Sequence, residues 1–254
     1  MMTFDEYIQN PMGIKNAVFS HREMYRELYK NKFNKIMLRE AGNLKYKLFR
    51  GLNKFYVYFK IPSEVIENFY YDVVIEFIPD NEFAKNDNSL SKYNVRFYSN
   101  DPSFVYTFAH AMKSNNMFIN DLSSKMSKIA LNTLAKERNP SNQPGYVKSI
   151  YFVYLAMKTF NLFDKRKFTS EGNLYNKTIL LSMIMDADKK VALRQEAANT
   201  KNKKARIAKQ KNDNDTEKIT SNHNNTIKKV KNSMFTKSIN KTSSVKNINR
   251  AKKI

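Results

Sequence analysis

Aromatic residues are almost absent from the last quarter of this chain. The sequence holds 18 Phe and 15 Tyr, yet Phe235 is the one aromatic residue between positions 187 and 254. A segment with so few large apolar side chains cannot bury enough surface to offset the entropy lost on ordering. We therefore expect a folded body over residues 1–186, and a tail over residues 187–254 that is helical at first and disordered from about residue 210 onward.

Positive charge has the opposite distribution. Residues 187–254 carry 19 Lys and Arg against 5 Asp and Glu, or +14 of the total +22, whereas residues 1–186 carry 26 against 18. Clustered cations on a flexible arm neutralise phosphate groups without reading sequence. The alternative is a solubilising tail whose lysines reflect the coding bias of an A+T-rich genome. We predict that the tail binds nucleic acid non-specifically, or an acidic partner, through Lys201, Lys203, Lys204, Arg206, Lys209, Lys211, Lys228, Lys229, Lys231, Arg250, Lys252 and Lys253.

Several classes of function lack their usual residues in this sequence. The absence of cysteine excludes disulfides, thiol catalysis and thiolate metal sites. The chain has five glycines and no Walker, Gly-X-Ser-X-Gly or His-Glu-X-X-His motif. The N-terminus lacks the pattern of a signal peptide, and no apolar run approaches the roughly 18 residues of a membrane span. We predict no catalytic residue, metal site, cofactor, membrane partner or secretion.

Two carboxylates offer the main argument for an enzyme. Asp72 and Glu76 would share one face of a strand, and with Glu82 or Asp101 they suggest the ligands of a magnesium-dependent nuclease. The Glu-X-Lys arrangement of one common nuclease class is missing, because Phe-Ala-Lys follows Glu82. The sequence therefore favours an ordinary solvated sheet face for these carboxylates.

The body begins with a helix and continues with strands. Apolar residues recur at helical spacing from Ser20 onward, and Gly42 stands where that helix would end. Alternating apolar and polar residues on both sides of Gly51-Leu52-Asn53 predict a β-hairpin. We expect a small antiparallel sheet of about four strands within residues 44–98, with strands near 44–50, 54–61, 69–78 and 92–98.

Helical patterns dominate the rest of the body, residues 103–186. They predict helices at 103–114, 121–136 and about 146–162, and a long helix that begins near residue 173 and leads into the tail. Strands that cluster early and helices that cluster late are typical of an α+β domain with helices on one sheet face. The predicted fold class is therefore α+β.

The stretch "NVRFYSNDPSFVYTFAHAM", residues 94–112, resembles a functional site in composition because it combines five Phe and Tyr rings with a histidine. Its pattern is that of a strand, a turn and a helix, with Asp101 or Ser103 as the helix cap. His110 falls on the opposite side from the apolar helix face, which predicts a solvated histidine. Aromatics of this strand and of "FYVYF" would also suit stacking on nucleic-acid bases, but packing in a core or at a protein interface is favoured.

A continuous apolar run marks the segment from Ile150 to Met157. As a helix it would be apolar all round, so it is either central to the fold or part of a subunit interface; a buried strand is the competing interpretation. The candidate interface residues, together with the outward-facing aromatic of the 94–112 stretch, are Ile150, Tyr151, Phe152, Tyr154 and Tyr106.

Two stretches, "YNVRFYSNDPSFVYTFAHAMKSNNMFI" and "RNPSNQPGYVKSIYFVYLAMKTFNLFDKRKF", lie within residues 90–170. On these stretches, residues 90–170 resemble uncharacterised structural or assembly proteins of tailed bacteriophages with A+T-rich genomes. The resemblance implies a non-enzymatic virion protein near the capsid, neck or tail, located in the virion or the host cytoplasm, whose partners are other virion proteins or further copies of itself. The alternative is a nucleic-acid-binding accessory protein of replication, transcription or packaging, with an enzyme as a third option.

Overall fold

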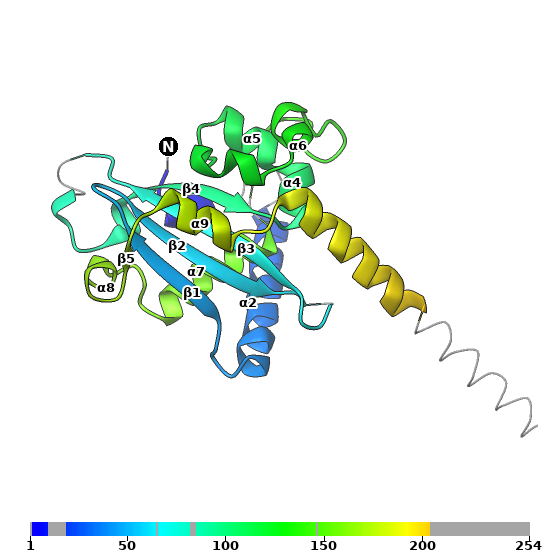
Figure 1. The fold of residues 1–254 in the computed structure, drawn as a ribbon, viewed down its shortest axis with the longest axis horizontal. Helices are drawn as coiled ribbons and strands as arrows, with labels where there is room; N and C mark the ends of the chain where they lie inside the picture. The colour runs from blue at the N-terminus through cyan, green and yellow to red at the C-terminus, as the bar shows by residue number, and fades with distance from the viewer. Residues whose placement is uncertain (1, 10–18, 65, 82–84, 146, 204–254) are drawn as a thin grey trace, which may run out of the picture. The chain divides into compact units, whose positions relative to one another are not determined.

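The computed structural model describes residues 2–9, 19–64, 66–81, 85–145 and 147–203. A first compact unit comprises residues 1–197, and residues 198–203 are the described part of the second. The first unit is an α+β body built on one sheet (Figure 1), which confirms the predicted fold class. It extends past the predicted boundary at residue 186, because Ala187 and Val191 are buried in it.

The sheet has the strand order β4-β3-β2-β1-β5. The four predicted strands are present with small shifts of their ends, and neighbours among them pair antiparallel. The sheet is nevertheless mixed, because an unpredicted short strand runs parallel to β1. The strands are β1 (Lys45–Arg50), β2 (Phe55–Pro62), β3 (Tyr70–Ile78), β4 (Asn94–Ser99) and β5 (Asn173–Leu174).

Two glycines explain where the first elements end. The long helix α2 (Phe19–Arg39) ends at a turn in which Ala41 and Gly42 have positive φ angles of 48° and 76°. Glycine takes that conformation at little cost, so Gly42 ends the helix as predicted. Between β1 and β2 the Gly51 N–H donates to the Lys54 carbonyl oxygen at 2.8 Å, which closes the predicted hairpin.

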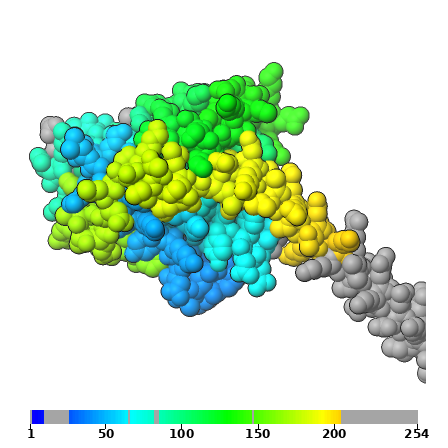
Figure 2. Space-filling view, in the orientation of Figure 1, coloured from blue at the N-terminus to red at the C-terminus, as the bar shows by residue number. Residues whose placement is uncertain are grey.

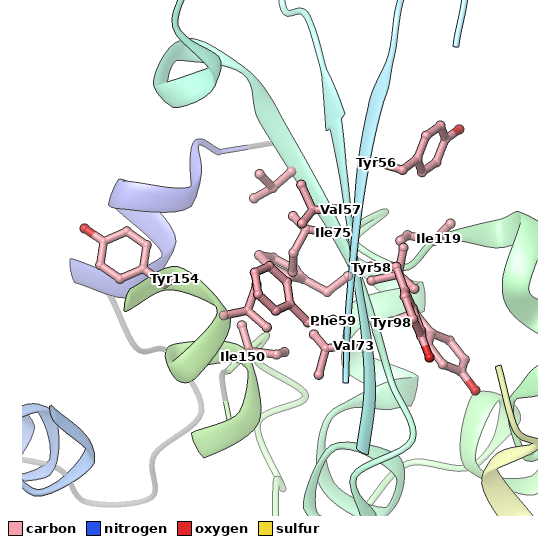
Figure 3. Packing of buried hydrophobic residues seen from close by; sticks show 14 of the residues in the cluster. Tyr56, Val57, Tyr58, Phe59, Val73, Ile75, Tyr98, Ile119, Ile150 and Tyr154 are labelled. Atoms are coloured by element: carbon pink, nitrogen blue, oxygen red, sulfur yellow. The ribbon is translucent and has the colours of Figure 1, made fainter. Parts of the chain in front are cut away.

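Alternation along the strands sends side chains to two faces, and both faces are buried. Val57 and Phe59 point to the face covered by α7 (Lys148–Thr159), which in turn packs on α2. Tyr56 and Tyr58 point to the other face, as Figure 3 shows. There α9 (Lys177–Met183) and the residues after it lie across the strands (Figure 2). We expected one face of the sheet to be solvated, and this cover shows that expectation to be wrong.

The helices after the sheet are shorter than predicted. The predicted helix at 103–114 is divided at Phe108 into α4 (Pro102–Thr107) and α5 (Ala109–Ser114). The prediction of one helix at 121–136 is wrong, because the 3-10 helix η2 (Asn120–Lys125) and the short helix α6 (Lys128–Asn132) occupy that stretch. The long helix from about 173 is also wrong, because residues 184–186 separate α9 from a helix over 187–203. The remaining elements are α1 (Phe4–Gln9), η1 (Leu90–Lys92) and α8 (Lys165–Ser170).

The two sides of the sheet differ in how far the backbone of the edge is already hydrogen-bonded. On β4, the Phe97 N–H donates to Met117 at 2.8 Å and the Val95 N–H donates to Met2 at 3.0 Å. Its outer edge is therefore paired with the chain's own backbone. On β1, β5 pairs only with Phe49 and Arg50, so the first part of that strand is open at the edge.

Candidate functional site

A buried carboxylate joins the sheet to the segment that leads toward the basic tail. Asp72 on β3 is 3% exposed, and its oxygens accept three hydrogen bonds. The donors are the Tyr58 hydroxyl at 2.8 Å, the Asn100 side-chain amide at 2.7 Å and the Met185 backbone N–H at 3.2 Å. We call these four residues the Asp72 anchor. Because Met185 lies between α9 and the 187–203 helix, the anchor fixes the start of that helix to the sheet.

Lys190 adds a cation to the surroundings of the Asp72 anchor. It is 8% exposed, and its Nζ lies 4.8 Å from the centre of the Phe69 ring. Burial lowers the pKa of Lys190, and the negative charge of Asp72 opposes that shift. The two buried charges therefore offset each other in part.

Glu76, four residues further along β3 and on the same face of the strand as Asp72, is also buried, at 3% exposure. It accepts hydrogen bonds from Lys54 Nζ at 2.8 Å and from the Tyr56 hydroxyl at 2.9 Å. Arg96 lies 3.6 Å away on the neighbouring strand. Glu76 is thus an internal ion-pair centre, and the expectation that Asp72 and Glu76 lie on a solvated face is wrong. The reason is that the segment after β5 covers this face.

The nuclease arrangement considered from the sequence does not form among the described residues. Asp101 caps α4 by accepting the Ser103 N–H at 2.9 Å, as predicted for the 94–112 stretch. Glu82 lies outside the described residues. In the part of the chain that the structure describes, no three His, Asp or Glu side chains are grouped so that they would hold a metal ion.

His110 is half-buried rather than solvated. Its Nδ1 lies 2.8 Å from the Asn142 side-chain oxygen, so the ring fastens α5 to the loop before α7. The expectation was wrong because the helix pattern takes no account of Asn142, which lies 32 positions further along the chain and contacts the ring. Tyr106, 44% exposed, faces outward as expected, and its role as an interface residue stays a prediction.

The apolar run at Ile150 forms helix α7, as favoured, and lies in the core. Ile150 and Phe152 are 0% and 1% exposed, and Tyr151 and Tyr154 are 6% and 7% exposed. The sequence left open whether this helix is central to the fold or part of a subunit interface. These four residues are central to the fold, and they offer little surface to a partner. The Tyr154 hydroxyl donates to Asp5 at 2.5 Å, which joins α7 to α1.

The sheet aromatics are not placed for stacking on bases. Tyr56, Phe59, Phe97 and Tyr98 are all 2% exposed or less. Phe97 instead stacks on Tyr7 of α1 with ring centres 4.4 Å apart. The residues that looked like a base-binding platform therefore pack the core, as the sequence favoured.

The predicted nucleic-acid contacts fall mostly outside the described residues. Lys201 and Lys203 lie in the 187–203 helix, and both are exposed. The others lie beyond the described residues: Lys204, Arg206, Lys209, Lys211, Lys228, Lys229, Lys231, Arg250, Lys252 and Lys253.

A cavity of about 480 Å³ opens at one end of the sheet, and sequence reasoning missed it. Its lining comes from the ends of β2 and β3 and from the first residues of α4 and α7, with further side chains from α2 and the 187–203 helix. Four cations line it, which are Lys32, Arg138, Lys148 and Arg194. We call this space the basic cavity. No local motif announces it, because its residues are far apart in the sequence.

Two carboxylates line the basic cavity beside the cations. Glu64 pairs with Lys148 at 2.5 Å and with Lys32 at 3.2 Å. Partial burial acts to raise the pKa of Glu64, but the two lysines lower it below its ordinary value. Asp101 is already engaged as the cap of α4. The four cations thus outnumber the two acids, and the cavity keeps a positive balance.

The fold and these sites define the chain as an α+β protein with a mixed five-stranded sheet covered on both faces. Compared with protein-family models, curated proteins and solved structures, the chain matches none. Among the described residues, no helix is both long and apolar enough to cross a membrane.

Proposed function

We propose that this chain is a non-enzymatic assembly protein that contacts nucleic acid, or an acidic partner, through the basic arm, which we define as residues 198–254. One observation carries the proposal: the arm holds 16 Lys and Arg against 3 Asp and Glu. Such an excess binds phosphate backbones irrespective of their sequence. The resemblance of residues 90–170 assigns this role to a tailed-phage virion.

The Asp72 anchor supports separate roles for the body and the basic arm. It attaches the residues just before the 187–203 helix to the sheet by hydrogen bonds to their backbone. Asp72 accepts the Met185 N–H at 3.2 Å, the Asn100 amide donates to the Met185 carbonyl oxygen at 3.2 Å, and the Tyr58 hydroxyl donates to the Met183 carbonyl oxygen at 3.3 Å. The body therefore holds the start of the helix that leads into the arm, while the arm supplies the charge. Burial of the aromatics on β2 and β4 removes support from base stacking on the face of the sheet.

DNA binding by the full chain is expected to weaken as salt rises, because each neutralised phosphate releases a counterion. Fluorescence anisotropy with a duplex of arbitrary sequence, at several KCl concentrations, measures the slope of log K against log salt. Each arm lysine that contacts a phosphate contributes about one unit to that slope. We expect a slope reduced by about three to four, and affinity reduced at least about tenfold at low salt, when glutamine replaces Lys228, Lys229, Lys231 and Lys252.

The control removes the same charge from the body. It replaces four exposed lysines with glutamine, namely Lys35, Lys47, Lys128 and Lys136. Equal weakening in both variants, or in neither, would contradict binding by the arm. The virion assignment has its own test, since the protein has to be present in purified particles of the phage that encodes it.

A further inference from the structure

We propose that the basic cavity binds the terminal phosphate of a nucleotide. This inference concerns the body alone and does not rest on the role of the arm. The phosphate is the free one of a mononucleotide or the 5′-phosphate of a nucleic-acid end, since the two share the same chemistry.

The size and shape of the cavity suit a small ligand. Its volume of about 480 Å³ lies within the range of about 300–1,000 Å³ typical of ligand pockets. Strands and helices make up much of its wall, through the ends of β2 and β3 and the starts of α4 and α7, while Glu64 and Arg138 come from the loops between such elements. A site held by strands and helices keeps its shape when a ligand enters.

The charge balance selects an anion of about two charges. Glu64 offsets one of its two lysine partners, and Asp101 offsets a further cation. Four cations against two acids leave +2. A phosphate monoester carries about −1.5 to −2 near neutral pH, which matches that balance more closely than a single carboxylate.

The two arginines are the groups most available to a ligand. No described residue forms an ion pair with Arg138 or Arg194, and Arg194 lies close enough to the Tyr71 hydroxyl for its charge to oppose the rise that burial causes in the pKa of that phenol. Guanidinium groups bind phosphate oxygens in a bidentate manner. The first turn of α7 also lines the cavity and has no side-chain cap, so its N–H groups add to the positive potential.

Aromatic side chains in the same wall favour a ligand with a planar ring. Tyr29 is half-buried, and Tyr71 and Phe108 line the cavity with the 8% and 7% of their surfaces that stay exposed, whereas Phe152 belongs to the core behind them. A base packs against the exposed parts of such rings, whereas inorganic phosphate gains nothing from them. The combination of cations and rings therefore points to a nucleotide rather than to phosphate alone.

Titration calorimetry on the full chain at physiological salt tests the proposal. The probes are AMP, adenosine, inorganic phosphate, and a short oligonucleotide with or without a 5′-phosphate. We expect AMP to bind more tightly than phosphate, and adenosine to bind at least about tenfold more weakly than AMP. If the 5′-phosphorylated oligonucleotide binds more tightly than both AMP and its unphosphorylated form, the source is a nucleic-acid end.

Two matched variants assign the binding to the cavity. The double variant Arg138→Gln/Arg194→Gln is expected to weaken AMP binding by about 10- to 100-fold, because two charge-assisted contacts are lost. Lys35→Gln/Lys128→Gln removes the same charge from exposed positions elsewhere in the body and should leave AMP binding unchanged. Both variants keep the arm intact, so a failure of arm binding does not affect this result. Absence of AMP binding, equal loss in both variants, or equal affinity for adenosine would overturn the proposal.

Discussion

Raising the pH from 9 to 12 is expected to unfold the body, because four buried tyrosines keep their protons in the folded state. Tyr56, Tyr58, Tyr98 and Tyr154 are each 7% exposed or less. Burial first, and then a nearby carboxylate, raises the pKa of each phenol above its ordinary value near 10. In the unfolded chain the same phenols ionise near pH 10.

The sign and size of the effect follow from proton binding. Above pH 10 the unfolded state has lost protons that the folded state retains, so stability present below pH 10 is lost as pH rises. Each tyrosine costs about 1.4 kcal/mol per pH unit, and four cost about 5 kcal/mol per unit. Domains are stable by only about 5–15 kcal/mol. Lysines also lose their charge in this pH range, which relieves repulsion between them and opposes the loss of stability. This relief is limited in the body, because +14 of the +22 lies in residues 187–254.

Two optical signals measured together test this prediction. Absorbance at 295 nm follows tyrosinate, and far-UV circular dichroism follows secondary structure. We expect part of the tyrosinate signal to appear only when the dichroism is lost, between about pH 11 and 12. Complete ionisation near pH 10 with the dichroism unchanged would show that these phenols are not protected by folding.

The second large effect is expected at the Asp72 anchor. Asp72→Ala leaves the Met185 N–H without an acceptor, whereas the Tyr58 hydroxyl and the Asn100 amide keep only their longer bonds to the Met183 and Met185 carbonyl oxygens, at 3.3 and 3.2 Å. It also leaves the buried Lys190 without the opposing charge of Asp72, so we expect a loss of about 3–5 kcal/mol in the free energy of unfolding. Urea denaturation of the full chain measures it, and hydrogen exchange at the Met185 amide reports the local release of the segment.

Two further variants separate the anchor from a general effect of charge. Asp72→Asn keeps one acceptor oxygen but turns an amide toward the other donors, so a smaller loss of about 2 kcal/mol is expected. Glu137→Ala removes an exposed acid that lies outside the core, and should change stability by less than about 0.5 kcal/mol. If Asp72→Ala behaved like Glu137→Ala, the segment around Met185 would be held by other contacts.

Local patterns in the sequence were sufficient to predict the elements of the first half of the fold. The hairpin of β1 and β2 follows from alternation around Gly51, and the end of α2 follows from Gly42. The later helices could not be placed in this way. Phe108 interrupts a continuous apolar pattern because tertiary packing, rather than propensity, decides the break.

The buried second face of the sheet had a signal that the prediction did not use. In "FYVYF" and "YYDVVIEFI" apolar side chains occupy both parities of the strand, which is typical of strands covered on both sides. That pattern implies that Asp72 and Glu76 are buried. Their partners, such as Met185 and Arg96, come from distant positions, as do the residues of the basic cavity, so no spacing rule connects them.

The edges of the sheet limit how copies of this protein associate. A β4 edge already paired with the backbone of Met2 and Met117 gives no template on which another chain can add a strand. On the open part of β1, the exposed Lys45 and Lys47 repel an incoming β1 strand of the same sequence. Among the described residues, strand addition is therefore disfavoured along β4 and along the open part of β1.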